Sequence, residues 1–182
     1  DRSVNNNGLI VNGTVTRTAV ATGADLVAYS GFTPSNYLEQ PYNSDLDFGT
    51  GDFSIMGWVK SNNIGSQRII NRQSADKYIN ISLSGSTLRT QFNSGPALAA
   101  TTIPPNVWTF FCVTRKDGVV SDYVNGVFGA SVSNALDLTD ADAVLTVGLD
   151  FSGIQPFNGS LALWRISATA PTAEQIAKIY ND

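Results

Sequence analysis

The sequence predicts an all-β fold, an antiparallel sandwich of two sheets with one short helix near the C-terminal end. Charged residues make up only 14% of the 182 residues, and Ser, Thr, Asn and Gly take their place, which suits strands and turns. Only two glutamates occur, Glu39 and Glu174, so residues that favour the exposed positions of helices are scarce, which argues against a helical protein. Short apolar or alternating runs bounded by turn residues recur along the chain, and one capped amphipathic segment follows them.

The expected strands cover, in order, residues 53–60, 68–73, 78–83, 87–92, 107–114, 121–124, 127–132, 144–149 and 160–167. In the first of them, Phe53, Ile55 and Val59 share one face, and Met56 and Trp58 share the other. We interpret Gly57 as a β-bulge that turns both sets inward, and we expect Trp58 to be a packing residue.

Turn residues join several of these strands into hairpins. Ser84-Gly85 follows a strand in which apolar residues alternate with Tyr78, Asn80 and Ser82, as expected when only one face of a strand is buried. Asn125-Gly126 is the strongest hairpin signal, because both residues tolerate the positive φ of a type I′ turn.

One helix is expected, close to the end of the chain. Thr172 can cap it, and Gln175 completes a Thr-x-x-Gln capping box. Ile176, Ile179 and Tyr180 form one apolar stripe, so we expect the helix to lie against the sandwich.

Composition excludes several function classes. The net charge is −4 and the basic residues are scattered, which argues against a nucleic-acid or membrane-surface partner. No apolar run approaches the ~18 residues of a membrane span. Histidine is absent, so neither a Ser-His-Asp triad nor an imidazole zinc site can form. Cys112 is the only cysteine, which excludes an intrachain disulfide, and we expect it to be a buried core residue.

The length fits a single domain over residues 1–182. Residues 1–30 are more polar and less regular, and they read either as edge strands of the domain or as a linker to an upstream stalk. Asp1 is not an initiator methionine, so we expect a fragment or a processed chain.

Four stretches resemble one family, the concanavalin A-like (laminin G-like) jelly rolls. They are Asn36-Tyr37-Leu38 with residues 46–60, residues 107–115 around Trp108, the hairpin Tyr123-Val124-Asn125-Gly126-Val127, and residues 159–166 with the closing helix. Within the family, the chain resembles in particular the C-terminal domain of bacteriophage tail-fibre (receptor-binding) proteins. That finer likeness rests on the amino-acid sequence of residues 167–176 and on the missing disulfide.

The resemblance implies a jelly-roll fold and a non-enzymatic receptor-binding module that recognises a bacterial surface polysaccharide. It also implies a homotrimer in the intact fibre, located in the virion after assembly in the host cytoplasm, with no nucleic-acid partner and no membrane insertion. Two alternatives remain, a structural trimerising or virion-decorating domain and a polysaccharide-degrading enzyme. A cluster of aromatic, arginine and asparagine side chains on one face would favour binding, and a large apolar self-interface would favour structure.

The chain departs from the family where catalysis would reside. Family glucanases carry carboxylates alternating along one strand in a Glu-x-Asp-x-x-Glu type arrangement, because a retaining mechanism needs two carboxyl groups about 5 Å apart. No strand expected here carries such a pair, so we expect no catalytic residues.

Two acidic loops suggest calcium only weakly. One contains Asp45, Asp47 and Asp52, and the other contains Asp137, Asp140 and Asp142. Carboxylate oxygens suit calcium, but aspartate also caps turns through its own backbone, and we favour that interpretation. Leu161-Ala162-Leu163 stands where family members often carry acidic residues. We therefore expect neither a metal nor another cofactor.

Sugar sites pair an aromatic platform with planar polar side chains. The candidate carbohydrate-binding residues are Tyr37, Tyr42, Arg72, Tyr78, Asn80, Arg89, Gln91 and Trp164. Each is open to a plainer interpretation as an outward polar residue of a sheet, and Trp164 can face either the core or the surface.

Overall fold

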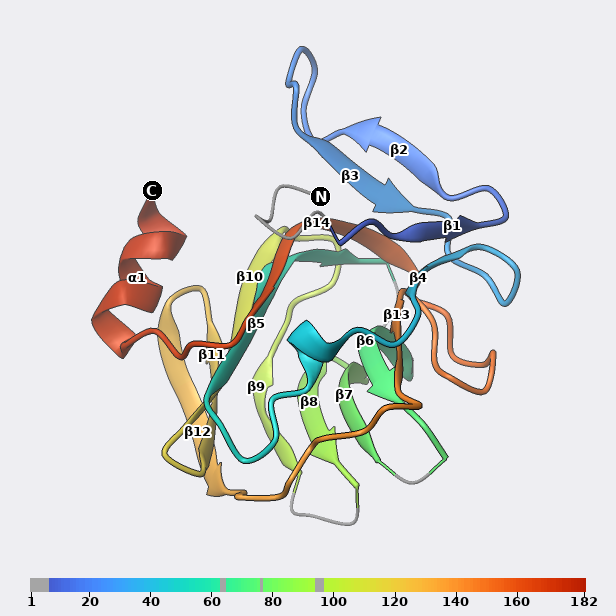
Figure 1. Cartoon of the computed structure of the whole chain (residues 1–182). Helices are drawn as coiled ribbons and strands as arrows, with labels where there is room; N and C mark the ends of the chain where they lie inside the picture. Colours follow the sequence, from blue (N-terminus) through green and yellow to red (C-terminus); the bar gives the residue numbers. More distant parts are fainter. Residues whose placement is uncertain (1–6, 63–64, 76, 94–96) are drawn as a thin grey trace.

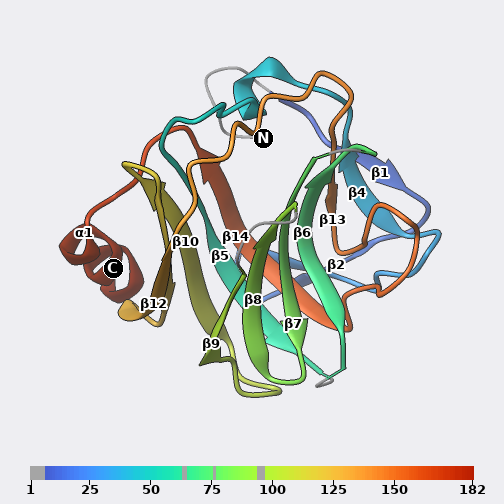
Figure 2. The ribbon, with the colours of Figure 1, turned by 90° about the horizontal axis from the view of Figure 1, so that it is seen from below.

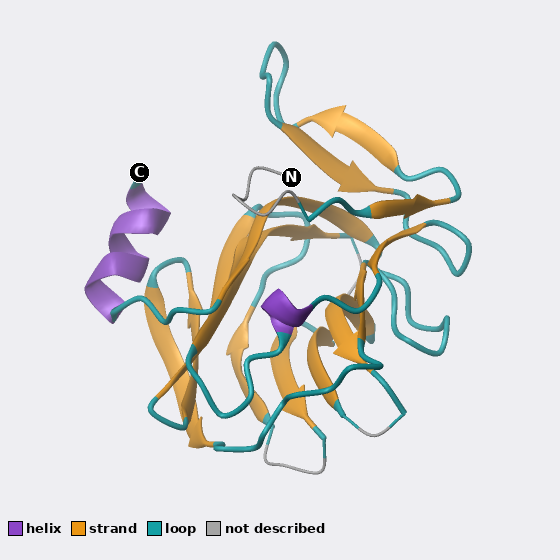
Figure 3. Cartoon of the chain, viewed as in Figure 1, coloured by secondary structure: helices purple, strands orange, loops and turns teal. Residues whose placement is uncertain are grey.

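Two antiparallel seven-stranded sheets pack face to face in the computed structural model, which describes residues 7–62, 65–75, 77–93 and 97–182 (Figures 1 and 3). Sheet A has the strand order β1-β4-β13-β6-β7-β8-β9, and sheet B has the order β12-β11-β10-β5-β14-β3-β2. The strands of sheet A are β1 (Ile10–Asn12), β4 (Tyr37–Gln40), β6 (Gln67–Gln73), β7 (Tyr78–Ser84), β8 (Thr87–Phe92), β9 (Leu98–Thr102) and β13 (Val144–Val147). Those of sheet B are β2 (Thr16–Ala19), β3 (Val27–Ser30), β5 (Phe53–Ser61), β10 (Thr109–Lys116), β11 (Val119–Val124), β12 (Val127–Ser133) and β14 (Gly159–Ser167).

The predicted two-sheet antiparallel sandwich with one C-terminal helix is confirmed. The nine expected strands occur with small shifts at their ends. Strand β9 was not expected, because Leu98-Ala99-Ala100-Thr101-Thr102 has little alternation, and its pairing with β8 is interrupted by a register shift. β1 pairs with β4, and the β2–β3 hairpin joins sheet B at β14, where it projects at the top of Figure 1.

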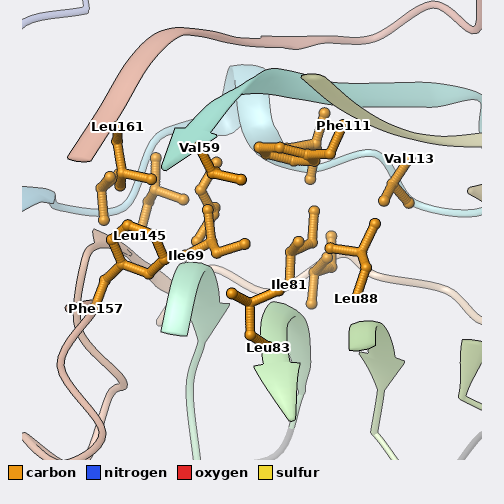
Figure 4. Close-up of a cluster of buried hydrophobic side chains, with 14 of the residues drawn as sticks. Val59, Ile69, Ile81, Leu83, Leu88, Phe111, Val113, Leu145, Phe157 and Leu161 are labelled. Atoms are coloured by element: carbon orange, nitrogen blue, oxygen red, sulfur yellow. The ribbon is translucent and has the colours of Figure 1, made fainter. Parts of the chain in front are cut away.

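The main core lies between the two sheets. Ile79, Ile81 and Leu83 of β7 belong to this core, as their alternation predicts. Figure 4 shows Ile81 and Leu83 facing residues of sheet B such as Val59 and Phe111. Each of these five side chains is at most 1% exposed. Because alternate residues of a strand point to opposite faces, the intervening residues of β7 must lie on the outer face of sheet A.

The bulge expected at Gly57 lies on the neighbouring strand, so that prediction is wrong. β5 pairs with β10 without interruption through Gly57, whereas β14 places Leu163 and Trp164 opposite it. Leu163 has a φ of +49°, as a bulge residue can. A side chain at position 57 would come within 2.8 Å of the Cβ of Trp164, so glycine is required there for a close approach of two strands.

A second, smaller core lies on the outer side of sheet B, under helix α1 (Ala173–Asn181). Figures 1 and 2 both place this helix beside β12, away from β6 and β7. Tyr180 stacks on Trp58 with ring centroids 5.8 Å apart, and Ile176 is fully buried. Met56 and Trp58 therefore face the helix and not the interior of the sandwich, and Trp58 is confirmed as a packing residue.

The local signals of helix and hairpin are also confirmed. Thr172 and Gln175 form the reciprocal capping box. Asn125 and Gly126 have φ of +51° and +76°, as a type I′ turn requires. Cys112 is buried beneath α1, and burial raises the pKa of its thiol to about 12. Among the described residues, no helix has the length and hydropathy needed to span a membrane.

Candidate functional site

The outer face of sheet A carries a continuous set of polar side chains, which we call the polar face. It consists of Tyr37, Glu39, Arg68, Asn71, Gln73, Tyr78, Asn80, Arg89, Gln91 and Thr146, contributed by β4, β13, β6, β7 and β8. Strand register arranges them in rows across the sheet. In Figure 2, β6, β7 and β8 can be followed next to one another.

The middle row crosses five strands in the order Glu39, Thr146, Asn71, Asn80 and Gln91. Asn71 is 0% exposed and Asn80 is 5% exposed. The side-chain oxygen of each is buried without a hydrogen-bond partner, whereas Nδ2 of Asn71 donates to the side chain of Gln73 at 3.2 Å. A buried polar atom left unpaired costs about 1–3 kcal/mol, so these two oxygens are acceptors in need of a donor.

The next row places Arg68 and Arg89 on either side of Ser82. Nε of Arg68 lies 3.6 Å from a carboxylate oxygen of Asp150, too far for a hydrogen bond, and this nitrogen is buried without an acceptor. Burial lowers the pKa of Arg68 and the positive charge of Arg89 lowers it further, while Asp150 acts in the opposite direction. Arg89 has no ion-pair partner within the described part of the chain.

Two tyrosines stand at the borders of the polar face. Tyr78 pairs across strands with Gln73, and its hydroxyl donates to the backbone carbonyl of Asn93. Tyr37 precedes Glu39 on the same side of β4, and burial together with this carboxylate raises the pKa of the Tyr37 hydroxyl. Both side chains are half-buried, so each presents part of an aromatic ring beside the row of amides.

The structure brings most of the sequence-predicted residues together and separates three. Tyr37, Tyr78, Asn80, Arg89 and Gln91 lie on the polar face. Tyr42 is exposed in the loop after β4, where its hydroxyl donates to Asp47 at 2.9 Å. Trp164 is half-buried in the bulge of β14. It packs against the main core, so of its two possible orientations it has the one toward the core.

Arg72 is the third residue that lies elsewhere. It is 5% exposed, and it alternates with its neighbours toward the interior. Its guanidinium donates to the carbonyls of Leu138 at 3.0 Å and Asp140 at 3.1 Å and pairs with the carboxylate of Asp47. Arg72 therefore ties two loops together and cannot contact a ligand on the polar face.

Sequence reasoning missed Arg68, Asn71 and Gln73 of β6. The register of β6 against β7 shifts between Arg68 and Ile70, so the consecutive residues Ile69 and Ile70 are both buried in the main core. A shift of one residue exchanges the two faces of a strand. Alternation alone could not assign a face to these residues, and the polar character of Asn71-Arg72-Gln73 was the only signal available.

The two acidic loops meet, and their carboxylates accept hydrogen bonds. Asp47 accepts from the backbone N–H of Asp140 at 3.0 Å, and the Arg72 guanidinium lies between the loops. Asp137 and Asp52 accept from backbone N–H groups of Thr139 and Asp117, each at 2.9 Å. Within residues 7–62, 65–75, 77–93 and 97–182, no group of three acidic, cysteine or histidine side chains could hold a metal.

We expect the melting temperature to change by less than about 2 °C when calcium is removed with a strong chelator. The Arg72 guanidinium already supplies the cation between the loops. Calcium bound at 100 times its dissociation constant would contribute about 2.7 kcal/mol, which corresponds to roughly 5–11 °C in a domain of this size. A fall of that size, reversed by added calcium, would contradict the prediction.

Comparison with protein-family models identifies the family to which this sandwich is similar. The family model described as the concanavalin A-like lectin/glucanases superfamily matches residues 30–177. A search of curated protein sequences finds no significant match.

Several solved structures are similar. Domain 4 of AbnA, a GH43 extracellular arabinanase from Geobacillus stearothermophilus in complex with arabinotriose, has a TM-score of 0.73 and 20% identity over 95% of this chain and 87% of that chain. The binding domain of Paraclostridial Mosquitocidal Protein 1 has a TM-score of 0.77 and 16% identity over 100% and 48%. Botulinum neurotoxin type C, whose cell entry depends on two ganglioside molecules, has a TM-score of 0.71 and 14% identity over 96% and 46%. At these identities the likeness shows the fold, and this chain spans about half the length of the two toxin chains.

Proposed function

This chain belongs to the concanavalin A-like lectin/glucanases superfamily, and from that premise we propose that it is a non-enzymatic module that binds carbohydrate on its polar face. The family match confirms the concanavalin A-like resemblance of the sequence. The family includes both lectins and glucanases, so the choice between binding and hydrolysis depends on the side chains of this chain.

The observation that carries the proposal is the pair of unpaired amide oxygens of Asn71 and Asn80. A sugar presents hydroxyl groups that donate hydrogen bonds, and planar amides accept and donate in the same plane. The two oxygens are buried, so binding requires neighbouring side chains such as the half-buried Gln73 and Gln91 to move. Tyr78 beside the row offers a ring against which the apolar face of a sugar can pack.

The carboxylates near the polar face support binding over hydrolysis. Glu39 is the only carboxylate among the residues of the polar face as defined above, and Asp150 lies at its border beside Arg68. Glu39 is on β4 and Arg68 is on β6, with β13 between them. Glycoside hydrolysis needs two carboxyl groups about 5–9.5 Å apart on opposite sides of the scissile bond. The middle row of the polar face contains the amides of Asn71, Asn80 and Gln91, and no second carboxylate accompanies Glu39 in it.

A finer proposal concerns the biological setting. We propose that the module belongs to a phage tail fibre, acts in the virion, and recognises a bacterial surface polysaccharide. The likeness of residues 167–176 to tail-fibre domains supports this setting. The intact fibre is then a homotrimer, in which three weak sites give an avidity about 10²–10⁴ above a single site. Light scattering on the fibre with its stalk tests the trimer, and a monomeric fibre would refute it.

We expect Asn80→Ala to weaken glycan binding at least tenfold without lowering the melting temperature. The substitution removes a side-chain oxygen that has no partner in the free protein, so folding loses no hydrogen bond through that oxygen. The probe is a panel of purified neutral and acidic bacterial polysaccharides, measured by calorimetry. Asn181→Ala on α1, exposed and away from the polar face, is the matched control.

Three outcomes separate the candidate functions. Binding lost in Asn80→Ala and kept in Asn181→Ala supports the proposal. Binding that survives Asn80→Ala unchanged places the site elsewhere and overturns it. A shortening of the polysaccharide that depends on Glu39 would establish the enzyme alternative.

A further inference from the structure

We infer that the polar face selects sugars that carry a carboxylate, and that Arg68 and Arg89 hold this group across Ser82. The inference rests on the proposed function and names the class of sugar. It starts from a local excess of positive charge on a protein whose net charge is −4.

The register fixes the spacing of the two arginines. Both Arg68 and Arg89 are paired with Ser82, one from β6 and the other from β8. Neighbouring strands lie about 4.7–4.9 Å apart, so the two backbones are about 9.5 Å apart on one face. Two extended arginine side chains can converge on one small group over that gap. Ser82 between them has a short side chain and is 1% exposed, so neighbouring side chains cover it, and a ligand would be held above it by the two guanidinium groups.

The charges at this end of the polar face do not balance. Asp150 is the carboxylate beside Arg68, and their 3.6 Å contact leaves the buried Nε of Arg68 without an acceptor. Arg89 has no ion-pair partner in the described ranges, and its positive charge repels that of Arg68. Glu39 is at the other end of the middle row, on β4. A ligand carboxylate would balance this excess of positive charge, because the guanidinium fork matches its two oxygens.

The same placement accounts for the amides. The row of Asn71, Asn80 and Gln91 runs next to the arginine row. The two rows are two residues apart on β7 and β8, or about 6.7 Å, and three residues apart on β6, where the register shifts. A pyranose whose ring carbon bears the carboxylate extends over this distance. With its carboxylate between the arginines, its hydroxyls lie over the row that contains the unpaired oxygens of Asn71 and Asn80.

The test compares uronic-acid oligosaccharides with the same oligosaccharides after chemical reduction of the carboxyl groups to alcohols. We expect the intact protein to bind the acidic form about 10–100 times more tightly, as one charge-assisted pair would give. Arg89→Gln should abolish this preference, because it removes one of the two guanidinium groups and keeps a planar polar side chain. Arg17→Gln, an exposed arginine on β2 of sheet B, is the matched control and should keep the preference.

The outcomes distinguish the inference from the proposed function. Equal binding of the acidic and reduced forms, lost in Asn80→Ala, overturns the inference and leaves the proposed function standing. An equal loss of both forms in Arg89→Gln also overturns it, because the arginine then contacts hydroxyls alone. Failure of every glycan to bind the polar face overturns both claims. A preference for phosphate-bearing glycans over uronic acids would replace the carboxylate by another anion and refute the inference as stated.

Discussion

We expect Arg115→Met to lower the free energy of unfolding by about 3–5 kcal/mol, because it removes a buried guanidinium that holds several backbone carbonyls. Arg115 is 0% exposed, and its guanidinium donates to the carbonyls of Gly51 at 2.8 Å, Leu136 at 2.8 Å and Gly49 at 2.6 Å. It also lies over the ring of Phe53, 5.1 Å from the centroid. Methionine keeps the apolar volume and removes every donor, so the carbonyls of Gly51 and Leu136 lose the guanidinium, and that of Gly49 keeps only the backbone N–H of Leu138.

Chemical denaturation followed by circular dichroism measures this loss, with Lys116→Met as the matched control. Lys116 is the next residue and is exposed, so its substitution should change stability by no more than about 0.5 kcal/mol. The expected fall in melting temperature for Arg115→Met is roughly 6–20 °C. Equal stabilities of the two variants would show that the loops at Gly49 and Leu136 hold their places without the guanidinium.

The second large effect is expected for Gly148→Ala, which should destabilise the fold by about 2–5 kcal/mol. Gly148 has a φ of +81°, in the region that favours glycine, and an added Cβ would come within 2.1 Å of the Phe32 ring. Phe32 cannot move freely, because it is 6% exposed and packs edge-on against Phe157. Backbone strain and steric overlap therefore act together at this position.

Gly153→Ala separates the two causes. Gly153 has a similar φ of +76°, but no atom lies within 4 Å of the position of an added Cβ. Its substitution should cost only the strain of a left-handed alanine, about 1–2 kcal/mol. If the two variants unfold at the same denaturant concentration, the Phe32 contact contributes nothing and the packing argument fails.

Local signals in the sequence determined the sandwich, the hairpins and the helix. The alternation of β7, the Asn125-Gly126 turn and the capping box of Thr172 each depend on residues close together in the chain. Their energies are set by backbone geometry and by contacts that any chain with that pattern makes. The motifs built from these elements also carried the resemblance to the concanavalin A-like family.

Only the tertiary structure decided the composition of the candidate site. The row from Glu39 to Gln91 comes from strands that are far apart in the sequence and adjacent in sheet A. The shift at Ile69 and Ile70 changes which residues of β6 face outward, and nothing local distinguishes Asn71 from Arg72. Arg72 turns inward because a loop more than sixty residues later supplies its acceptors. Strand register and buried hydrogen bonds arise between distant segments, so the sequence by itself determined the sheets and the fold determined which side chains meet on them.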